Sequence, residues 1–290
     1  MRGGLGRRSI VRSGSMVVAL GGAAGLLVTS CGSDDDATSA TTQVTVTDTS
    51  LAATNTDIPA PRGSWQVAAL GDSFMATQNS KGQTFVDLYA AALQGSEQRT
   101  VTVDDLSDDS NTTARLLERL RTDDSTRSSV SNADIIVISV GGNDSDPFGV
   151  YPQGTCSPTQ PLPDCLATYA PTFAANYELI LTEVDSLRNG QPTAVRVTSA
   201  DNPFVGWSEA PTPTFGVDFY AQVAQAETDA ACAAATSHAA LCVDYLHIFG
   251  GPDGTADPAP FLGPDHAHPG DVGIQAISDA LAQLGLSELQ

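Results

Sequence analysis

"ADIIVISV", residues 133–140, is the stretch that decides the fold. After Asp134 it runs through five β-branched side chains and one serine, with no alternation between apolar and polar positions. A strand with one face in solvent would alternate, whereas a continuous apolar run is typical of a parallel sheet that is buried on both faces. The stretch therefore predicts an α/β protein.

Further strands and helices are expected on either side of this strand. Strands are predicted at 64–71, 98–106, 193–200 and 240–246, and helices at 84–93, 111–121, 166–190, 217–239 and 272–286. Pro171 is expected to break or restart the long third helix. Strand and helix alternate five times, which predicts one parallel sheet with helices on both faces.

Polar segments follow the first and third strands and precede the last helix. They are "LGDSFMA" at 70–76, "GGND" at 141–144 and "DHAHPGDVG" at 265–273. Ligands bind beyond the carboxyl ends of the strands in such a sheet. Acyl transfer needs a nucleophile, a base, a group that orients the base and donors for the oxyanion. Ser73 alone would be a turn residue, but with an Asp265–His268 pair it is a candidate nucleophile, and Asp72 is interpreted as part of the turn that presents it.

Taken in this order, "GDS", "GGND" and "DHAHP" resemble the motifs of the GDSL, or SGNH, hydrolases over residues 66–285. The resemblance implies a flavodoxin-like three-layer α/β/α fold with a five-stranded parallel sheet. It also implies esterase or lipase chemistry without a cofactor. By this likeness Ser73 is the nucleophile, His268 the general base and Asp265 the group that orients His268. The amide of Asn143 and the backbone N–H of Ser73 donate to the oxyanion.

One position departs from the family pattern. The family usually has a glycine in the loop after the second strand, and its N–H is the third oxyanion donor. Here the nearest register places Ser110 at that position, and no glycine occurs between Gly95 and Gly141. Ser110 is the expected donor, but serine adopts fewer backbone conformations than glycine, and two aspartates precede it. Since one such donor contributes about 3–4 kcal/mol, we expect a slow or narrowly specific enzyme, or an oxyanion hole rearranged around Asn143.

The other histidines have plainer interpretations. His266 is an alternative base, but the spacing from Asp265 and the following proline favour His268. His238 is expected at a helix end, and His247 is expected as a satisfied core residue. A metal site in the segment around His266 is not expected, because no further clustered ligands are evident. Trp207 is expected either to line a substrate pocket or to pack a lid.

The N-terminal residues 1–30 read as a lipoprotein signal peptide. Four arginines precede an uncharged run from Met16 to Ser30, which is short for a membrane span and fits the apolar core of a secretory signal. "LVTSC" resembles a bacterial lipobox, which implies cleavage before Cys31 and a lipid on its sulfur. A plain cleavable signal or an uncleaved anchor is the alternative.

Residues 31–63 are expected to be the lipidated cysteine and a disordered tether, because they have little apolar bulk to bury. The hydrolase domain is expected at 64–290. The protein is therefore expected to be exported and held at the extracytoplasmic face of the cell membrane.

The remaining cysteines form two close pairs in the sequence. Four cysteines allow three pairings, and we expect the local ones, Cys156–Cys165 and Cys232–Cys242, in an exported protein. Neither pair has the spacing of a zinc site.

The charge of the chain limits its partners. The formal net charge is −21, and all 34 acidic residues follow Ser30. This charge repels phosphate backbones, so nucleic-acid binding is not expected. We expect a monomer that acts on a small-molecule, lipid or glycan ester. Two alternatives are an acyltransferase and a catalytically impaired binding protein for acylated envelope glycans or lipids.

Overall fold

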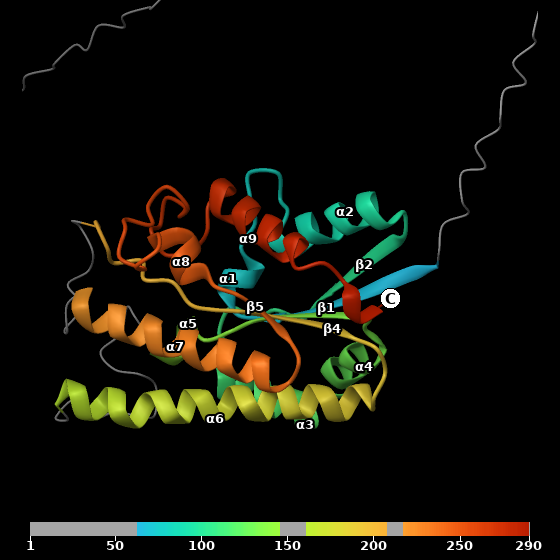
Figure 1. The fold of residues 1–290 in the computed structure, drawn as a ribbon, viewed down its shortest axis with the longest axis horizontal. Helices are drawn as coiled ribbons and strands as arrows, with labels where there is room; N and C mark the ends of the chain where they lie inside the picture. The colour runs from blue at the N-terminus through green and yellow to red at the C-terminus, as the bar shows by residue number, and fades with distance from the viewer. Residues whose placement is uncertain (1–62, 146–160, 208–216, 290) are drawn as a thin grey trace, which may run out of the picture. The chain divides into compact units, whose positions relative to one another are not determined.

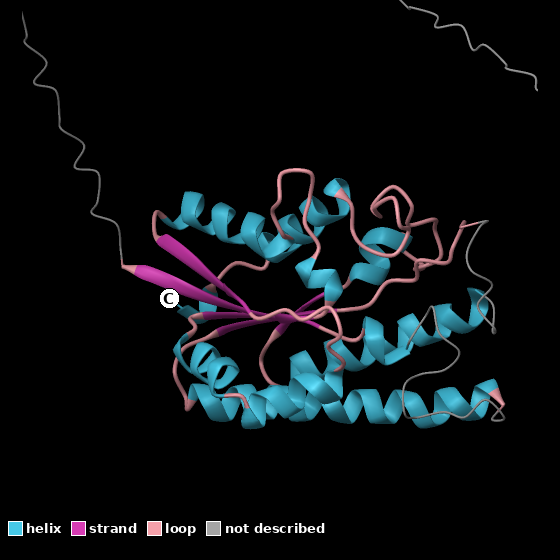
Figure 2. Ribbon diagram, turned by 180° about the vertical axis from the view of Figure 1, so that it is seen from behind, coloured by secondary structure: helices cyan, strands magenta, loops and turns pink. Residues whose placement is uncertain are grey.

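The computed structural model describes residues 63–145, 161–207 and 217–289, and in these ranges it contains one sheet of five parallel strands (Figures 1 and 2). The strand order is β2-β1-β3-β4-β5, which is the flavodoxin-like order. The predicted fold class is confirmed. The strands are β1 (Ser64–Gly71), β2 (Thr100–Asp105), β3 (Ile135–Ser139), β4 (Ala194–Thr198) and β5 (Leu241–Val243).

Helices cover both faces of the sheet, as Figure 1 shows. One face carries α2 (Phe85–Glu97), α8 (Tyr245–Gly250) and α9 (Asp271–Gln283), and the other carries α3 (Thr113–Thr122), α4 (Asp124–Asn132), α6 (Leu162–Arg188) and α7 (Val217–Ser237). Three short elements remain: α1 (Ser73–Ala76), α5 (Gly142–Ser145) and the 3-10 helix η1 (Ser287–Leu289).

The apolar composition of the central strand β3 follows from its burial on both faces of the sheet. Ile136 and Ile138 belong to the apolar cluster under α3, α6 and α7, while Ile135 and Val137 belong to the cluster under α2 and α9. All four side chains are fully buried. Because successive residues of a strand point to opposite faces, a strand covered on both faces favours apolar side chains at successive positions.

Several helices differ from the sequence prediction. Helix α4 was not predicted, and it starts because the side chain of Asp123 caps it by accepting the N–H of Thr126. Helix α8 was not predicted either. Residues 244–246 were expected to continue the fifth strand, but the side chain of Asp244 accepts the N–H of His247 and starts the helix instead.

The expected break at Pro171 does not occur, and α6 continues through it. A proline inside a helix removes one backbone hydrogen bond. On this helix, however, Tyr169, Phe173 and Tyr177 lie four residues apart and are all buried. Their packing outweighs the local preference of proline, as tertiary contacts commonly outweigh propensity.

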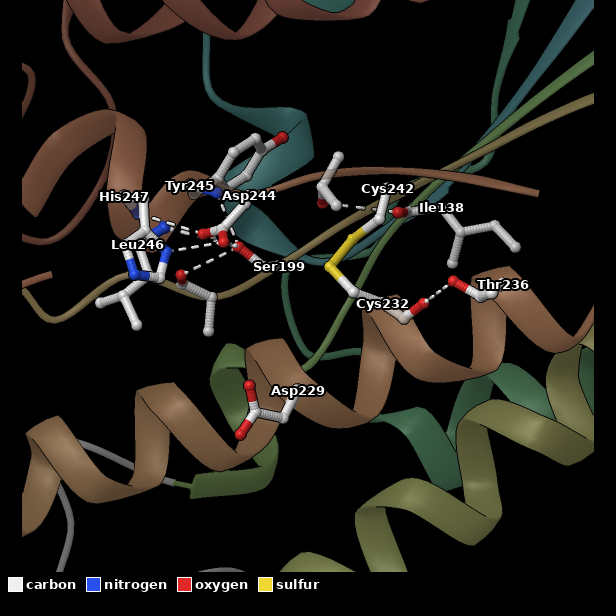
Figure 3. Close-up of a disulfide and its surroundings, with 12 residues drawn as sticks. Ile138, Ser199, Asp229, Cys232, Thr236, Cys242, Asp244, Tyr245, Leu246 and His247 are labelled. Atoms are coloured by element: carbon white, nitrogen blue, oxygen red, sulfur yellow. Dashed lines mark hydrogen bonds and ion pairs between the residues drawn. A yellow bond between two sulfur atoms is a disulfide. The ribbon is translucent and has the colours of Figure 1, made fainter. Parts of the chain in front are cut away.

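The predicted disulfide between Cys232 and Cys242 is confirmed, with 5.2 Å between the Cα atoms (Figure 3). It joins α7 to β5. Cys156 lies outside the described residues, so the Cys156–Cys165 pair stays a prediction. Cys31, the signal peptide and the tether lie outside them as well.

Within the described ranges, no helix combines the length and apolarity that a membrane crossing requires.

Candidate active site

The candidate site lies where β1 and β3 end side by side. The chain leaves β1 toward one edge of the sheet and β3 toward the other, and such a switch point is where ligands bind in this type of fold. Gly71 of β1 pairs with Ser139 of β3. A Cβ atom on Gly71 would lie 2.6 Å from the carbonyl oxygen of Ser139 and 2.5 Å from Cβ of Met75. Only glycine therefore lets the turn after β1 fold this closely onto β3.

Asp72 joins the two strand ends. Its buried carboxylate accepts the N–H of Phe74 at 3.0 Å, capping α1, and also the N–H groups of Gly141 at 3.0 Å and Gly142 at 3.2 Å. Burial raises the pKa of Asp72 to about 6, against the effect of these three backbone donors. Asp72 thus holds the turn that presents Ser73, as interpreted from the sequence.

Ser73, His268 and Asp265 form a hydrogen-bonded chain. Nε2 of His268 lies 2.9 Å from Oγ of Ser73, and Nδ1 of His268 lies 2.7 Å from Oδ2 of Asp265. The other carboxylate oxygen accepts the N–H groups of Ala267 and His268, both at 3.1 Å. The structure therefore brings together the three residues that the sequence assigned to the triad.

Electrostatics keep Asp265 ionised. Partial desolvation would raise its pKa, but the hydrogen bonds from the His268 ring and from two backbone N–H groups outweigh it, so the pKa is lowered. The negative charge faces Nδ1 of His268. It therefore favours the tautomer in which Nδ1 carries the proton and Nε2 is free to accept one from Ser73.

His266 points elsewhere. Its backbone has a positive φ of 56°, and its ring stacks on Trp207 with 5.1 Å between centroids and 11° between planes. Trp207 in turn stacks on Phe204. His266 thus belongs to an aromatic stack, which places it apart from the Ser73 hydroxyl, and the expected preference for His268 agrees with this geometry.

A second Asp-x-x-His pair has the same internal geometry. Nδ1 of His247 lies 2.6 Å from Oδ2 of Asp244 (Figure 3). The prediction that His247 is a core residue is wrong, because its side chain is 37% exposed on α8. The nearby Ser199 accepts the N–H of Tyr245 at 2.6 Å and contacts Asp244 instead of His247. The spacing is therefore shared by two pairs, but of the two histidines only His268 contacts a serine hydroxyl among the described residues.

The N–H of Ser110 is engaged in the resting structure, so its expected role as an oxyanion donor stays a prediction. Its N–H donates to Oδ1 of Asp108 at 3.0 Å, and its hydroxyl donates to the same atom at 2.7 Å. Arg115 holds this exposed turn from outside, because its guanidinium donates to the Ser110 hydroxyl and to Asp108. Asp108, two residues before Ser110, thus accepts in the resting structure the backbone N–H that the family's glycine would offer to the oxyanion.

The side-chain amide of Asn143 is hydrogen-bonded to the same loop, the one after β2. Its Nδ2 donates to the carbonyl oxygens of Asp109 at 2.9 Å and Asn111 at 2.8 Å. Asn111 in turn donates through its own amide to the carbonyl of Gly71 at 2.9 Å. By contrast, the structure shows no acceptor for the N–H of Ser73 within the described part of the chain. Before an oxyanion forms, Ser73 is therefore the one predicted donor that is free.

Asp144 also binds the segment after β2, where that segment enters α3. Its carboxylate accepts the N–H and the hydroxyl of Thr113, at the start of α3, at 2.8 and 2.5 Å. Burial raises the pKa of Asp144 to about 6. Sequence reasoning treated this aspartate only as part of the "GGND" motif. Its structural role depends on a contact 31 residues away along the chain.

A cavity of about 220 Å³ opens beside Ser73 and His268. It extends between the loops after β3 and β4 to the inner face of α7. Sequence reasoning missed two carboxyl side chains that line it, Asp201 and Glu227. A signal for Glu227 was present, because it shares a helical face with Tyr220, Val223 and Ala224 at offsets of seven, four and three, where an apolar residue is expected.

No group of three or more side chains suited to a metal ion occurs in the ranges that the structure describes.

The comparisons with known proteins agree with this geometry. The model of the GDSL-like Lipase/Acylhydrolase family matches residues 69–276. The lipase Lip_vut3 from a goat rumen metagenome is 19% identical, with a TM-score of 0.63, covering 78% of this chain and 100% of its own. None of the curated proteins compared with the chain matches it.

Two further solved structures are similar. The acetylxylan esterase Axe2 from Geobacillus stearothermophilus is 19% identical, with a TM-score of 0.51, covering 78% of this chain and 96% of its own. The lipase/acylhydrolase from Enterococcus faecalis is 17% identical, with a TM-score of 0.51, covering 78% of this chain and 97% of its own. At these identities the likeness shows the fold, whereas the family match spans most of the chain. The chain therefore belongs to the GDSL-like lipase/acylhydrolase family and is a carboxylic ester hydrolase.

Proposed function

We propose that the protein hydrolyses esters through an acyl-enzyme on Ser73. The Ser73 Oγ attacks the ester carbonyl carbon while Nε2 of His268 takes the hydroxyl proton, and Asp265 orients the imidazole and stabilises its charge. The tetrahedral intermediate collapses, and His268 gives the proton to the departing alkoxide. Water, deprotonated by His268, then attacks the acyl-enzyme, and His268 returns the proton to Oγ of Ser73 as the acid leaves. The observation that carries this proposal is the pair of contacts at 2.9 and 2.7 Å.

The oxyanion is stabilised by two donors in this mechanism. The N–H of Ser73 is one, and the amide of Asn143 is the second. Asn143 donates to two carbonyl oxygens in the resting protein, so it must release or share one of them when the oxyanion forms. This rearrangement adds a cost to the chemical step and is a physical reason to expect slow turnover.

The proposed setting is the outer side of the cell membrane. It is supported by the arginine-rich start, the apolar run and "LVTSC" at Cys31. Lipid esters and acetylated glycans are the proposed substrates at such a surface. The similarity in fold to an acetylxylan esterase makes acetylated sugars a reasonable first choice among them.

The nucleophile is tested by labelling the full chain with a fluorophosphonate. We expect the wild-type protein to be labelled and Ser73→Ala to lose the label, while Ser237→Ala, at the exposed end of α7, keeps it. His268→Ala should lose both label and ester turnover. The matched control is His247→Ala, which removes the other Asp-x-x-His histidine and should keep both. Equal labelling of wild type and Ser73→Ala, or of neither, would contradict the proposal and favour the impaired binding protein.

The location is tested separately. We expect the full-length protein to be recovered with the membrane fraction and Cys31→Ala to be released from it. Retention of that variant in the membrane would count against lipidation.

A further inference from the structure

The cavity beside Ser73 has an unusual charge balance. Asp72, Asp201 and Glu227 line it, and they come from the turn after β1, the loop after β4 and α7. Among the described residues that line it, His268 is the only basic one. The cavity is otherwise largely apolar, with Phe204 among its aromatic walls.

Two side chains that line this cavity each carry a polar atom without a hydrogen-bond partner among the described residues. Oδ2 of Asp201 is shielded from solvent and makes no hydrogen bond within the described residues. The hydroxyl of Tyr245, a residue only 1% exposed, likewise makes none of ordinary geometry, although the hydroxyls of Ser139 and Thr198 are its neighbours. A buried polar group without a partner costs about 1–3 kcal/mol. A ligand that supplies a partner would recover that free energy on binding.

Glu227 differs from Asp201 because it already has a partner. It is 3% exposed, and the hydroxyl of Tyr169 donates to its Oε1. This contact fixes the carboxyl group on the cavity side of α7. Glu227 therefore adds to the polarity of the wall, while Asp201 offers the free acceptor.

We infer that the cavity accepts an ester whose enclosed part carries a hydrogen-bond donor, a hydroxyl or an ammonium group, that meets Oδ2 of Asp201, and that it rejects esters carrying a carboxylate. This inference rests on the proposed function, because the cavity selects substrates only if Ser73 is the nucleophile. Asp201 is then a specificity-determining residue of the ester hydrolase.

The size of the selection follows from the cost of unpaired groups. An alkyl ester leaves Oδ2 of Asp201 unpaired, and a site built to hydrogen-bond a substrate hydroxyl discriminates strongly against the analogue that lacks it. For one such bond we expect roughly 10-fold to 10²-fold in kcat/KM. A carboxylate would lose its hydration in a largely apolar cavity where His268 is the only basic side chain among the described lining residues, so we expect a loss of at least roughly 10²-fold.

The test uses four ethyl esters of butanoic acid that differ only in the substituent at the third carbon: methyl, hydroxyl, ammonium or carboxylate. A mirrored series of butyl acetates carries the same groups on the alcohol side, so that either half of the substrate is allowed to enter the cavity. The readout is the ratio of kcat/KM between members of one series at pH 7. We expect the hydroxyl or the ammonium ester to exceed the methyl ester, and the carboxylate ester to be slowest.

Variants assign the selection to its residue. Asp201→Ala should bring the ratio of the donor-bearing ester to the methyl ester close to one. Asp201→Asn, which keeps the shape and an acceptor oxygen, should retain a preference for the hydroxyl but lose any preference for the ammonium. The matched control is Asp229→Asn, which removes an exposed carboxylate from the same helix as Glu227 and should leave every ratio as in the wild type. Fluorophosphonate labelling of Ser73 reports whether each variant is folded.

The outcomes separate two kinds of failure. If Ser73 is labelled but the donor-bearing and methyl esters react equally in both series, or the carboxylate ester reacts as fast, the inference is overturned and the proposed function stands. If no ester is turned over and Ser73 is not labelled, the proposed function itself fails. Preference for ammonium over hydroxyl, or the reverse, supports the inference and identifies the donor.

Discussion

The carboxylate of Asp265 is 55% exposed, whereas Asp72 beside the nucleophile is buried. Solvent screens a charge at such a position, so the attraction between Asp265 and an imidazolium is weaker than in a dry site. Asp265 then acts mainly by holding the ring of His268 in place. The backbone N–H groups of the 265–268 turn share this task, because they fix the aspartate itself.

We therefore predict that Asp265→Asn lowers kcat for a short p-nitrophenyl ester by roughly 10²-fold. Ser73→Ala and His268→Ala should each lower it by roughly 10⁴-fold or more, as removal of a nucleophile or base does elsewhere. Steady-state kinetics on the three variants measure which substitution lowers kcat most. A loss for Asp265→Asn as large as that for His268→Ala would show that screening does not weaken the pair.

Asn143 and Ser110 should respond differently to truncation. Asn143→Ala removes the proposed second oxyanion donor and should lower kcat by roughly 10²-fold with little change in KM. Ser110→Ala, by contrast, should change kcat by less than about 3-fold, because its N–H remains directed at Asp108. Comparable losses in the two variants would contradict this assignment of the donors.

These residues also mark the limit of sequence reasoning at this scale. Ser73, Asp265 and His268 are recognisable because their residue types and order are set by the chemistry. For Ser110 the sequence did not reveal that a hydrogen bond to Asp108, two residues earlier, decides where its N–H points in the resting structure. Asp201 was missed because the atom that makes it notable is one that lacks a contact, and no pattern in the sequence records that.

At the scale of elements, α7 and β5 are joined by the Cys232–Cys242 disulfide (Figure 3). The two cysteines are 10 residues apart. A closed loop of that length stabilises the folded state by about 2–3 kcal/mol through the unfolded chain. Strand β5 has only three residues, so it relies on this link and on its pairing with β4.

We predict that the double variant Cys232→Ser/Cys242→Ser loses about 2–3 kcal/mol of unfolding free energy. Urea titration followed by circular dichroism measures it. Because α7 forms the inner wall of the cavity, selection among esters should weaken together with stability. An unchanged midpoint of unfolding would mean that the bridge adds nothing to the packing of α7.

The alternation of strand and helix was predictable because the central strand β3 is a continuous apolar run and the long helices carry apolar residues at helical spacing. Two of the helices that were missed, α4 and α8, have in common that a single aspartate cap starts them, at Asp123 and Asp244. Capping depends on one side chain accepting one N–H. A hydrophobic pattern read over many residues therefore does not detect a cap. For this reason the fifth strand was predicted to extend past Val243, where it ends.

At the scale of the whole molecule, buried carboxyl groups make stability depend on pH. Burial raises the pKa of Glu227 to about 8 and that of Asp201 to about 7. In the unfolded chain both groups ionise near pH 4. The folded state therefore holds protons that the unfolded state has lost, and the free energy of unfolding falls as the pH rises from about 4 to about 8. The acidic net charge acts in the same direction.

We predict that the melting temperature is higher at pH 5 than at pH 8. Glu227→Gln should reduce this difference, because glutamine cannot ionise in the same place, and the reduction should correspond to an unfolding free energy on the order of 3 kcal/mol. Asp229→Asn, on the exposed side of α7, serves as the control and should keep the wild-type dependence. Calorimetry of the three proteins at both pH values measures the effect. A melting temperature that rises with pH would contradict the prediction.

Strand β1 begins at Ser64 and reaches the site only at its carboxyl end. The C-terminal η1 lies near the start of β1, at the end of the sheet away from the site (Figure 1). Eight residues of extended chain span about 26 Å. Both ends of the described domain thus leave it far from the cavity mouth. A resin, a fluorescent reporter or a second enzyme coupled through either end would leave the mouth unobstructed, so the protein is suited to immobilisation without loss of access for bulky esters.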